Sequence, residues 1–87
     1  MTQYRIEIKS KAKKELANLP KEVAGKIYSA ILGLADNPRS SGCKKLVGSE
    51  NSYRIRINNY RVVYSIFDQI LLIQVVKIAH RQEVYKS

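Results

Sequence analysis

A predicted hairpin over residues 53–64 constrains the fold of this chain more than any other segment. Residues 53–57 read Tyr-Arg-Ile-Arg-Ile, an alternation of apolar and charged side chains that is typical of a β-strand with one buried face. A second strand follows directly, after Asn58 and Asn59. Asparagine tolerates the positive φ angles of a two-residue hairpin turn, so we expect the two strands to pair through this turn.

This pairing brings three arginines together. Arg56 would lie directly opposite Arg61, and Arg54, two residues along its strand, would lie on the same face. Like charges directly opposite each other destabilise a sheet by some tenths of a kcal/mol. Three arginines in this arrangement therefore indicate a site for an anion, although solvated side chains on an open sheet face are the simpler interpretation.

The net charge favours an acidic partner. The chain has 16 Lys and Arg against 7 Asp and Glu, a formal charge of +9, and this favours RNA, DNA or an acidic protein. Its single cysteine, Cys43, excludes an internal disulfide and lies in no metal-ligand spacing, so we expect no metal and no cofactor. The start of the chain does not look like a signal peptide, and the apolar stretch 70–78 is too short to span a bilayer, so we expect the cytoplasm and no membrane contact.

The remaining sequence predicts an α+β fold. A first strand holds Tyr4, Ile6 and Ile8, Ser10 can cap a first helix, and Asn37-Pro38 ends a second helix. The apolar stripes of the two helices are Ala12, Leu16 and Leu19, and Val23, Ile27, Ala30, Ile31 and Leu34. Three strands follow as an antiparallel meander, 53–57, 60–67 and about 70–78, with a tight turn at Asp68-Gln69. We expect one domain over 1–87, strand-helix-helix-meander, with both helices on one sheet face.

Strand alternation also predicts which residues share each face of the meander. The face that receives the helices would hold Tyr53, Ile55, Ile57, Tyr60, Val62, Tyr64, Ile66, Leu71, Ile73 and Val75. The other face would hold Arg54, Arg56, Arg61, Val63, Ser65, Leu72, Gln74 and Val76. This second face is open and its charge is all of one sign, so we expect a platform for a polyanion.

With these elements in order, the chain resembles the RelE/ParE toxin superfamily. The resemblance rests on the element order, on Leu19-Pro20 between the helices, on the hairpin, and on the ending His-Arg-Gln-Glu-Val-Tyr over residues 80–85. RelE-type members are ribosome-dependent endoribonucleases that cleave mRNA and are neutralised by an antitoxin. The resemblance therefore implies three partners: the ribosome, its mRNA, and a cognate antitoxin in a heteromeric complex that can bind operator DNA.

The resemblance also implies site residues. The two basic residues of the family's hairpin match Arg54 and Arg56, and its hairpin arginine matches Arg61. The family's arginine after the meander matches Arg81, and its C-terminal tyrosine matches Tyr85. In the family's chemistry the RNA 2′-hydroxyl attacks the adjacent phosphate and leaves a 2′,3′-cyclic phosphate and a 5′-hydroxyl. Guanidinium groups would stabilise the negative charge that builds on the phosphate oxygens.

The resemblance leaves three alternatives for the proton acceptor. RelE-type enzymes often have lysine where Arg54 and Arg56 stand, and arginine, unlike lysine, does not give up its proton. Three alternatives remain: His80 accepts the proton, the ribosome supplies the acceptor, or the site works by electrostatics alone. The lysines of the first helix, Lys11, Lys13 and Lys14, are either its solvated face or a contact to the ribosomal RNA backbone.

Two other functions fit the same sequence. One is a ParE-type protein that inhibits DNA gyrase without catalysis, a branch that usually lacks the C-terminal tyrosine. The other is a nucleic-acid-binding corepressor without catalysis, which the uncertain proton acceptor keeps open. Tyr85 favours the ribonuclease.

Overall fold

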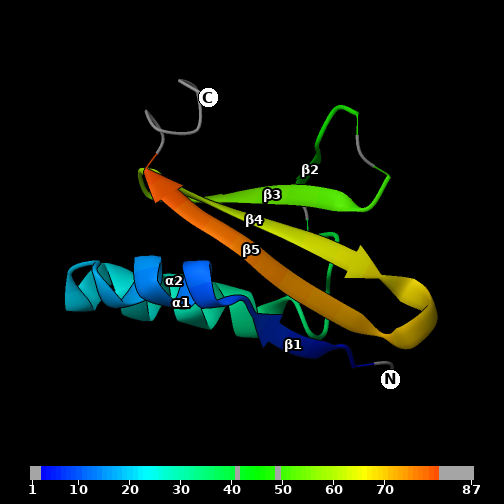
Figure 1. The fold of residues 1–87 in the computed structure, drawn as a ribbon, viewed down its shortest axis with the longest axis horizontal. Helices are drawn as coiled ribbons and strands as arrows, with labels where there is room; N and C mark the ends of the chain where they lie inside the picture. The colour runs from blue at the N-terminus through cyan, green and yellow to red at the C-terminus, as the bar shows by residue number, and fades with distance from the viewer. Residues whose placement is uncertain (1–2, 41, 49, 81–87) are drawn as a thin grey trace.

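The chain folds as two helices packed on one face of a five-stranded sheet (Figure 1). The computed structural model describes residues 3–40, 42–48 and 50–80. Its elements are β1 (Arg5–Ile8), α1 (Ser10–Ala17), α2 (Lys21–Gly33), β2 (Lys44–Lys45), β3 (Ser52–Ile57), β4 (Tyr60–Phe67), a 3₁₀ turn (Asp68–Ile70) and β5 (Leu72–His80). The strand order is β1-β5-β4-β3-β2, in which β1 runs parallel to β5 and all other neighbours are antiparallel.

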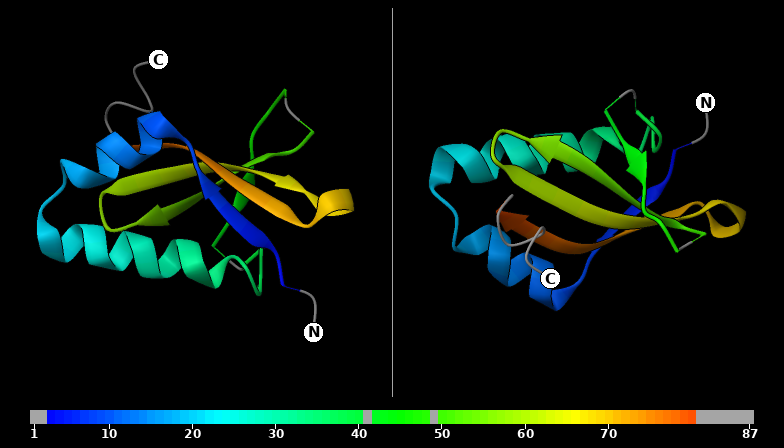
Figure 2. Two further views of the ribbon diagram at one scale, coloured as in Figure 1. Left: turned by 60° about the horizontal axis from the view of Figure 1, so that its bottom comes forward. Right: turned by 90° about the horizontal axis from the view of Figure 1, so that it is seen from above.

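The core forms between the helices and the sheet face turned toward them (Figure 2). Its buried members are Ala12, Ile27, Ile31, Leu34, Ile55, Val62, Tyr64, Ile66, Ile73, Val75 and Ile78. The helical stripes and the alternation of β3 and β4 thus meet as predicted, and the α+β class with both helices on one sheet face is confirmed. The structure adds a two-residue strand, β2, within a stretch that had no predicted element.

The helix ends differ from the prediction. Ser10 is the first helical residue rather than the cap; the N-cap is Lys9, whose extended backbone continues from β1, and no side chain caps the helix. α2 begins after Pro20, whose φ of −54° suits the entry to a helix. The helix ends at Gly33, earlier than Asn37-Pro38 predicts, and a turn over 34–36 takes the chain to that proline.

The connection between β4 and β5 is longer than a two-residue turn. A 3₁₀ turn covers Asp68–Ile70, and Leu71 then adopts a left-handed conformation with φ +51°. The prediction that Leu71 belongs to the core is therefore wrong, because Leu71 is 40% exposed and β5 begins only at Leu72. The alternation in β5 otherwise starts as predicted, with Ile73 and Val75 completely buried.

A β-bulge in β5 shifts the last part of that strand. Val75 lies opposite Tyr64 but Lys77 lies opposite Val63, so Val76 is the extra residue. Before the bulge the odd-numbered residues of β5 point toward the helices, and after it the even-numbered residues do. Ile78 consequently joins the core, and Lys77 moves to the face that carries the arginines.

Glu15 of α1 covers the edge of β5 where β1 no longer pairs with it. The β1–β5 pairing ends with Ile8 opposite Val75, and the N–H of Lys9 still donates to the Val75 carbonyl at 2.9 Å. Further along, the N–H of Ile78 donates to Oε1 of Glu15 at 2.9 Å. A side chain of the helix therefore replaces the missing strand at the bulge.

We expect Glu15→Ala to lower the free energy of unfolding by about 1–3 kcal/mol, because the Ile78 N–H loses its acceptor at a partly buried position. Glu15→Gln keeps an acceptor oxygen and should lose less than half of that. Urea denaturation of the three proteins measures both values. Equal losses for the two substitutions would show that the charge, and not the hydrogen bond, matters.

A polar cluster ties the chain together at the other end of the sheet. Arg39 forms an ion pair with Asp68 at 2.8 Å, and the Tyr4 hydroxyl donates to Asp68 at 2.6 Å. The Arg39 guanidinium and the Tyr4 hydroxyl hold the pKa of Asp68 at about 2, below its usual value near 3.8. Nearby, the Tyr64 hydroxyl donates to the Pro38 carbonyl at 2.8 Å, which fixes the loop after α2 to the sheet.

The cluster predicts a specific pH dependence. Because the pKa of Asp68 is lower in the folded chain, its stabilising effect is complete above about pH 5 and is lost progressively as the pH falls through 2. We expect wild type to be more stable than Asp68→Asn at pH 6 and the difference to shrink steadily between about pH 5 and about pH 1. Denaturation series at several pH values test this, and a difference that does not shrink over this range would contradict it. The effect is small because both partners are about half exposed.

Within the described ranges, no helix is long and apolar enough to cross a membrane.

Candidate nucleic-acid interface

The sheet face turned away from the helices carries two adjacent rows of cations. In the first row, Arg56 of β3 lies directly opposite Arg61 of β4, and Ala79 of β5 completes the row. The predicted hairpin pairing is thus confirmed. Only Asn58 of the turn has a positive φ, +55°, and among the described residues outside glycine it shares this feature with Leu71 alone.

The second row lies two residues along β3. Lys44 of β2 is opposite Arg54, Arg54 is opposite Val63 of β4, and Val63 is opposite Lys77 of β5. Side chains directly opposite each other share a face, with Cβ atoms about 4.5–5.5 Å apart. The two rows therefore hold five cations: Lys44, Arg54, Lys77, Arg56 and Arg61. We call these five residues the cationic face.

The charge of this sheet surface changes beyond the second row. The next row places Ser65 opposite Gln74 and Gln74 beside Glu7 of β1, and the Gln74 amide donates to the Glu7 carboxylate at 2.8 Å. The expectation that the open face has charge of one sign only is therefore wrong, because the prediction did not include β1 as a neighbour of β5. On β2 to β5 the cations of this face lie at the end of the sheet near the β3–β4 turn, and Arg5 of β1 lies at the opposite end.

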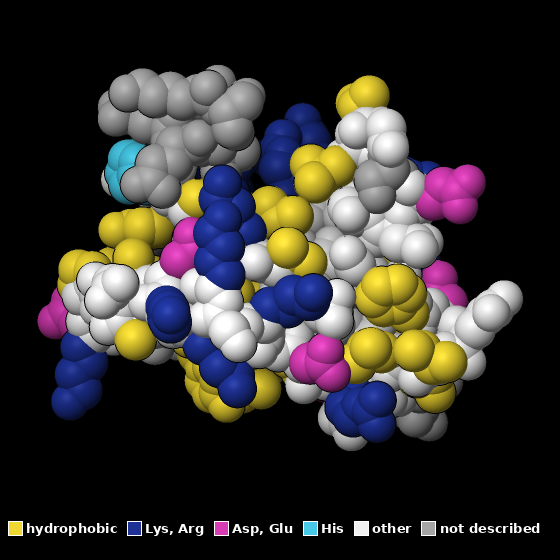
Figure 3. All heavy atoms as spheres, in the orientation of Figure 1, with side chains coloured by type: hydrophobic (Ala, Val, Ile, Leu, Met, Phe, Trp, Pro, Cys, Tyr) yellow, Lys and Arg dark blue, Asp and Glu magenta, His cyan; other side chains and the backbone are white. Residues whose placement is uncertain are grey.

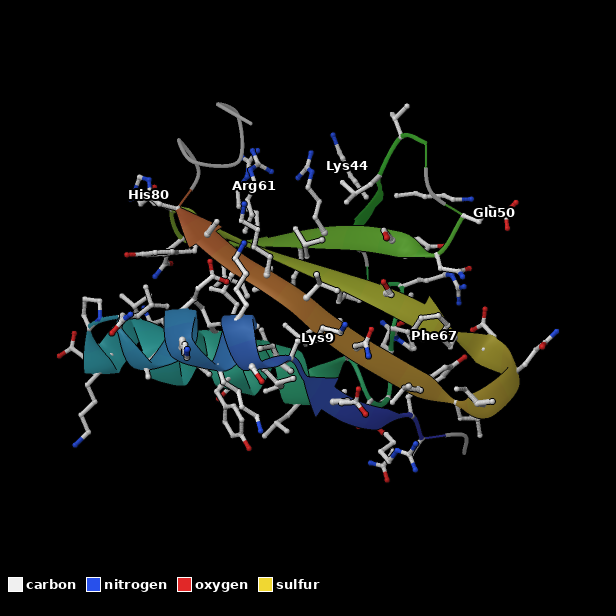
Figure 4. The ribbon with its side chains drawn as sticks, in the orientation of Figure 1. Lys9, Lys44, Glu50, Arg61, Phe67 and His80 are labelled. Carbon is white, nitrogen blue, oxygen red and sulfur yellow. The ribbon has the colours of Figure 1, made fainter. Side chains whose placement is uncertain are left out.

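Arg61 differs from its neighbours in burial. Its side chain is completely buried, whereas Arg56 is exposed and Arg54 is half-buried. Within the described part of the chain, Arg61 is the only charged residue in the buried class. Arg61 is therefore not a solvated arginine on an open sheet face. A guanidinium group that is removed from water requires partners for its charge. Figure 4 shows Arg61 and Lys44 projecting from the sheet on the side away from the helices.

His80 lies on a different face. It is opposite Tyr60 in β4, and the two rings contact edge to face with centroids 5.3 Å apart. Tyr60 belongs to the helix-facing side, so His80 shares that side at the end of β5 and not the face of Arg61. Its surroundings are a hollow of about 250 Å³ that Glu15, Leu19 and Ile78 help to line.

The predicted RNA-contacting lysines of the first helix belong to a different element from the residues of the cationic face. Lys11, Lys13 and Lys14 are exposed on α1, and Glu15 of this helix contacts β5. Figure 3 shows lysine and arginine side chains over α1 and also higher in the view, where the sheet lies. Two of the predicted site residues, Arg81 and Tyr85, lie outside the described residues.

Sequence reasoning missed Lys44 and Lys77. β2 is two residues long and has no alternation to find, so nothing in the sequence placed Lys44 beside Arg54. For Lys77 a signal existed: core residues recur at 73, 75 and 78, and one extra residue between 75 and 78 restores the alternation if a bulge is assumed.

The chain is similar over nearly its whole length to toxins of known family. A family model described as the ParE toxin of the type II toxin-antitoxin system parDE matches residues 6–85. The putative toxin RelE1 of Methanocaldococcus jannaschii is 34% identical, over 97% of either chain. The chain belongs to the RelE/ParE toxin family. Toxin RelE of Mycobacterium tuberculosis is 30% identical to this chain, over 95% of this chain and 87% of the relative.

Solved structures agree with this assignment. The crystal structure of the archaeal RelE–RelB complex from Pyrococcus horikoshii superimposes with a TM-score of 0.80 at 31% identity, covering 93% of this chain and 97% of that one. The isolated Escherichia coli RelE toxin superimposes with a TM-score of 0.79 at 26% identity, covering 95% and 92%. The resemblance seen in the sequence is confirmed, and this chain is a RelE-type toxin of a type II toxin–antitoxin system.

Proposed function

We propose that this toxin is a ribosome-dependent endoribonuclease that cleaves mRNA. The observation that carries the proposal is the pair formed by buried Arg61 and exposed Arg56, directly opposite each other on the sheet face turned away from the helices. A sheet tolerates opposed like charges at a cost, and a phosphate between them removes that cost. The similarity to RelE-type toxins supports the proposal, because the sequence resemblance associates that branch of the family with this chemistry.

In the proposed reaction the 2′-oxygen of the RNA attacks the neighbouring phosphorus. The bond from phosphorus to the 5′-oxygen breaks, and the products are a 2′,3′-cyclic phosphate and a 5′-hydroxyl that has gained a proton. Negative charge grows on the nonbridging oxygens in the transition state, where fixed guanidinium donors stabilise it. Arg61 suits this role because a completely buried side chain needs little reorganisation when the charge appears. Arg56 would bind this phosphate from the opposite strand, Arg54 would bind the RNA backbone one row away, and Arg81 and Tyr85 would complete the site.

The position of His80 bears on the choice of proton acceptor. His80 is on the helix-facing side of the sheet and Arg61 on the other, so one phosphate bound between Arg56 and Arg61 does not meet the imidazole in this arrangement. Neither arginine gives up its proton. We therefore propose that the ribosome supplies the acceptor or that electrostatic stabilisation carries the step, and this is the reason for expecting ribosome dependence.

A cognate antitoxin completes the proposal. Several similar structures are RelE–RelB toxin–antitoxin complexes, those of Pyrococcus horikoshii and Escherichia coli among them. We propose that this toxin is likewise neutralised in a heteromeric complex in the cytoplasm, by a protein that brings acidic and apolar residues to a chain of formal charge +9. Binding of operator DNA by that complex is part of the same proposal.

The test compares two forms of the same mRNA. Purified toxin should cleave mRNA in translating ribosomes and leave the protein-free mRNA almost intact, with both followed by primer extension. Equal cleavage of the two forms would reject ribosome dependence. Absence of cleavage in both, together with inhibition of purified DNA gyrase, would instead establish the ParE-type function.

A further inference from the structure

We infer that Lys44, Arg54 and Lys77 form a second phosphate subsite, which binds the phosphate next to the one that is cleaved. The inference rests on the proposed function for the identity of the first phosphate. Its own basis is the second row of the cationic face, two residues from the pair of Arg56 and Arg61.

The second row repeats the unfavourable arrangement of the first. Lys44 lies directly opposite Arg54, as Arg56 lies directly opposite Arg61. Each pair of like charges raises the energy of the folded sheet in the absence of an anion. Two such pairs on one face, in adjacent rows, are not explained by solvation alone, because either pair could be avoided by one neutral residue.

Lys77 closes the subsite on its other side. Val63 lies between Arg54 and Lys77 in the row and is only half-buried, so it forms a low floor between two long cationic side chains. The bulge at Val76 is what places Lys77 there. Without the bulge the side chain of Lys77 would point into the core.

The spacing of the rows fits a polynucleotide. Residues i and i+2 of a strand are about 6.6 Å apart, and flexible lysine and arginine side chains can adjust from that separation to successive phosphates of one strand. A mononucleotide would occupy one row only. The track ends after two rows, because the following row contains Gln74 hydrogen-bonded to the Glu7 carboxylate, which would repel a third phosphate.

The experiment uses ligands that cannot be cleaved. A deoxydinucleotide lacks the 2′-hydroxyl, and it can carry one phosphate between its nucleosides or a second at its 5′ end. Each form is titrated into the purified chain, and amide shifts in NMR spectra give the dissociation constants. For wild type, the second phosphate should tighten binding by at least about threefold, as expected for exposed to half-exposed ion pairs.

Neighbouring residues supply matched controls. Lys44→Ala and Lys77→Ala should each remove most of the gain from the second phosphate. Lys45→Ala changes the same charge one residue from Lys44 but on the opposite face, since Lys45 lies opposite Tyr53, and should retain the gain. Lys26 is exposed on α2, and Lys26→Ala is the matching control for Lys77→Ala.

Several results would overturn the inference: no gain in wild type, equal effects of Lys44→Ala and Lys45→Ala, or a gain that Lys77→Ala leaves intact. Binding of a glutamate-rich peptide with the same residue dependence, and no gain for the dinucleotide, would assign the row to an acidic protein instead. The assay involves no cleavage. A gain that behaves as expected while ribosome-bound mRNA stays intact would reject only the proposed function, and the reverse result would reject only the second subsite.

Discussion

Arg61→Ala should lower cleavage of ribosome-bound mRNA by about 10²-fold or more, the size of effect seen when one preorganised donor to a transition-state oxyanion is removed. The reason is the position of Arg61, which is buried and directly opposite Arg56. Arg61→Lys should recover only part of the rate, because a point charge cannot reproduce a guanidinium that donates two parallel hydrogen bonds. Single-turnover cleavage at saturating toxin measures both.

The control for this prediction is Arg5→Ala. Arg5 lies on the same sheet face but far from the cationic face, opposite Leu72, and its exposed side chain carries the same charge. We expect a cleavage rate within about threefold of wild type, which is the size of an exposed charge effect. Because Arg61 is buried, Arg61→Ala should also lower the free energy of unfolding, by about 1–3 kcal/mol, so the folded fraction is measured alongside. A folded Arg61→Ala protein with full activity would refute the site.

Ile73→Ala should lower the free energy of unfolding by about 2–5 kcal/mol, a large part of the stability of a domain of this size. Ile73 is completely buried in β5, with Ile6 of β1 on one side and Ile66 of β4 on the other. Truncation leaves a cavity in the middle of the sheet that neither neighbouring strand can fill. Urea denaturation monitored by circular dichroism measures the loss.

Leu71→Ala is the matched control for Ile73→Ala. Alternation alone places both residues on the helix-facing side, but Leu71 lies in the left-handed position after the 3₁₀ turn and is 40% exposed. Its truncation should cost less than about 1 kcal/mol. Similar losses for the two substitutions would mean that β5 begins earlier than described and that Leu71 belongs to the core.

The elements with long, regular patterns could be predicted from the sequence. The stripe of Ile27, Ile31 and Leu34 and the alternation of the hairpin each repeat several times, and burial of one face leaves only one register for them. The opposed arginines follow directly from that register and a two-residue turn. The family resemblance rests partly on the same hairpin and partly on the short motifs Leu19-Pro20 and residues 80–85.

What could not be predicted depends on contacts between distant residues. The bulge at Val76 is stabilised on one side by Glu15, which lies more than sixty residues away, and it decides the face of Lys77. The burial of Arg61 could not be predicted either, because alternation assigns a residue to one face of the sheet but does not tell what covers that residue. The 3₁₀ turn before Leu71 replaces a shorter turn that the sequence allows equally well.

The central claim is that the cationic face promotes attack of an RNA 2′-hydroxyl on the adjacent phosphate, and the products of cleavage test it most directly. Messenger RNA cleaved in translating ribosomes by wild-type toxin should end in a 2′,3′-cyclic phosphate and begin with a 5′-hydroxyl. Replacing the single nucleotide before the cleaved bond by its 2′-deoxy form should abolish cleavage there. Undiminished cleavage of the deoxy-substituted mRNA, or fragments with a 3′-hydroxyl and a 5′-phosphate, would contradict the account.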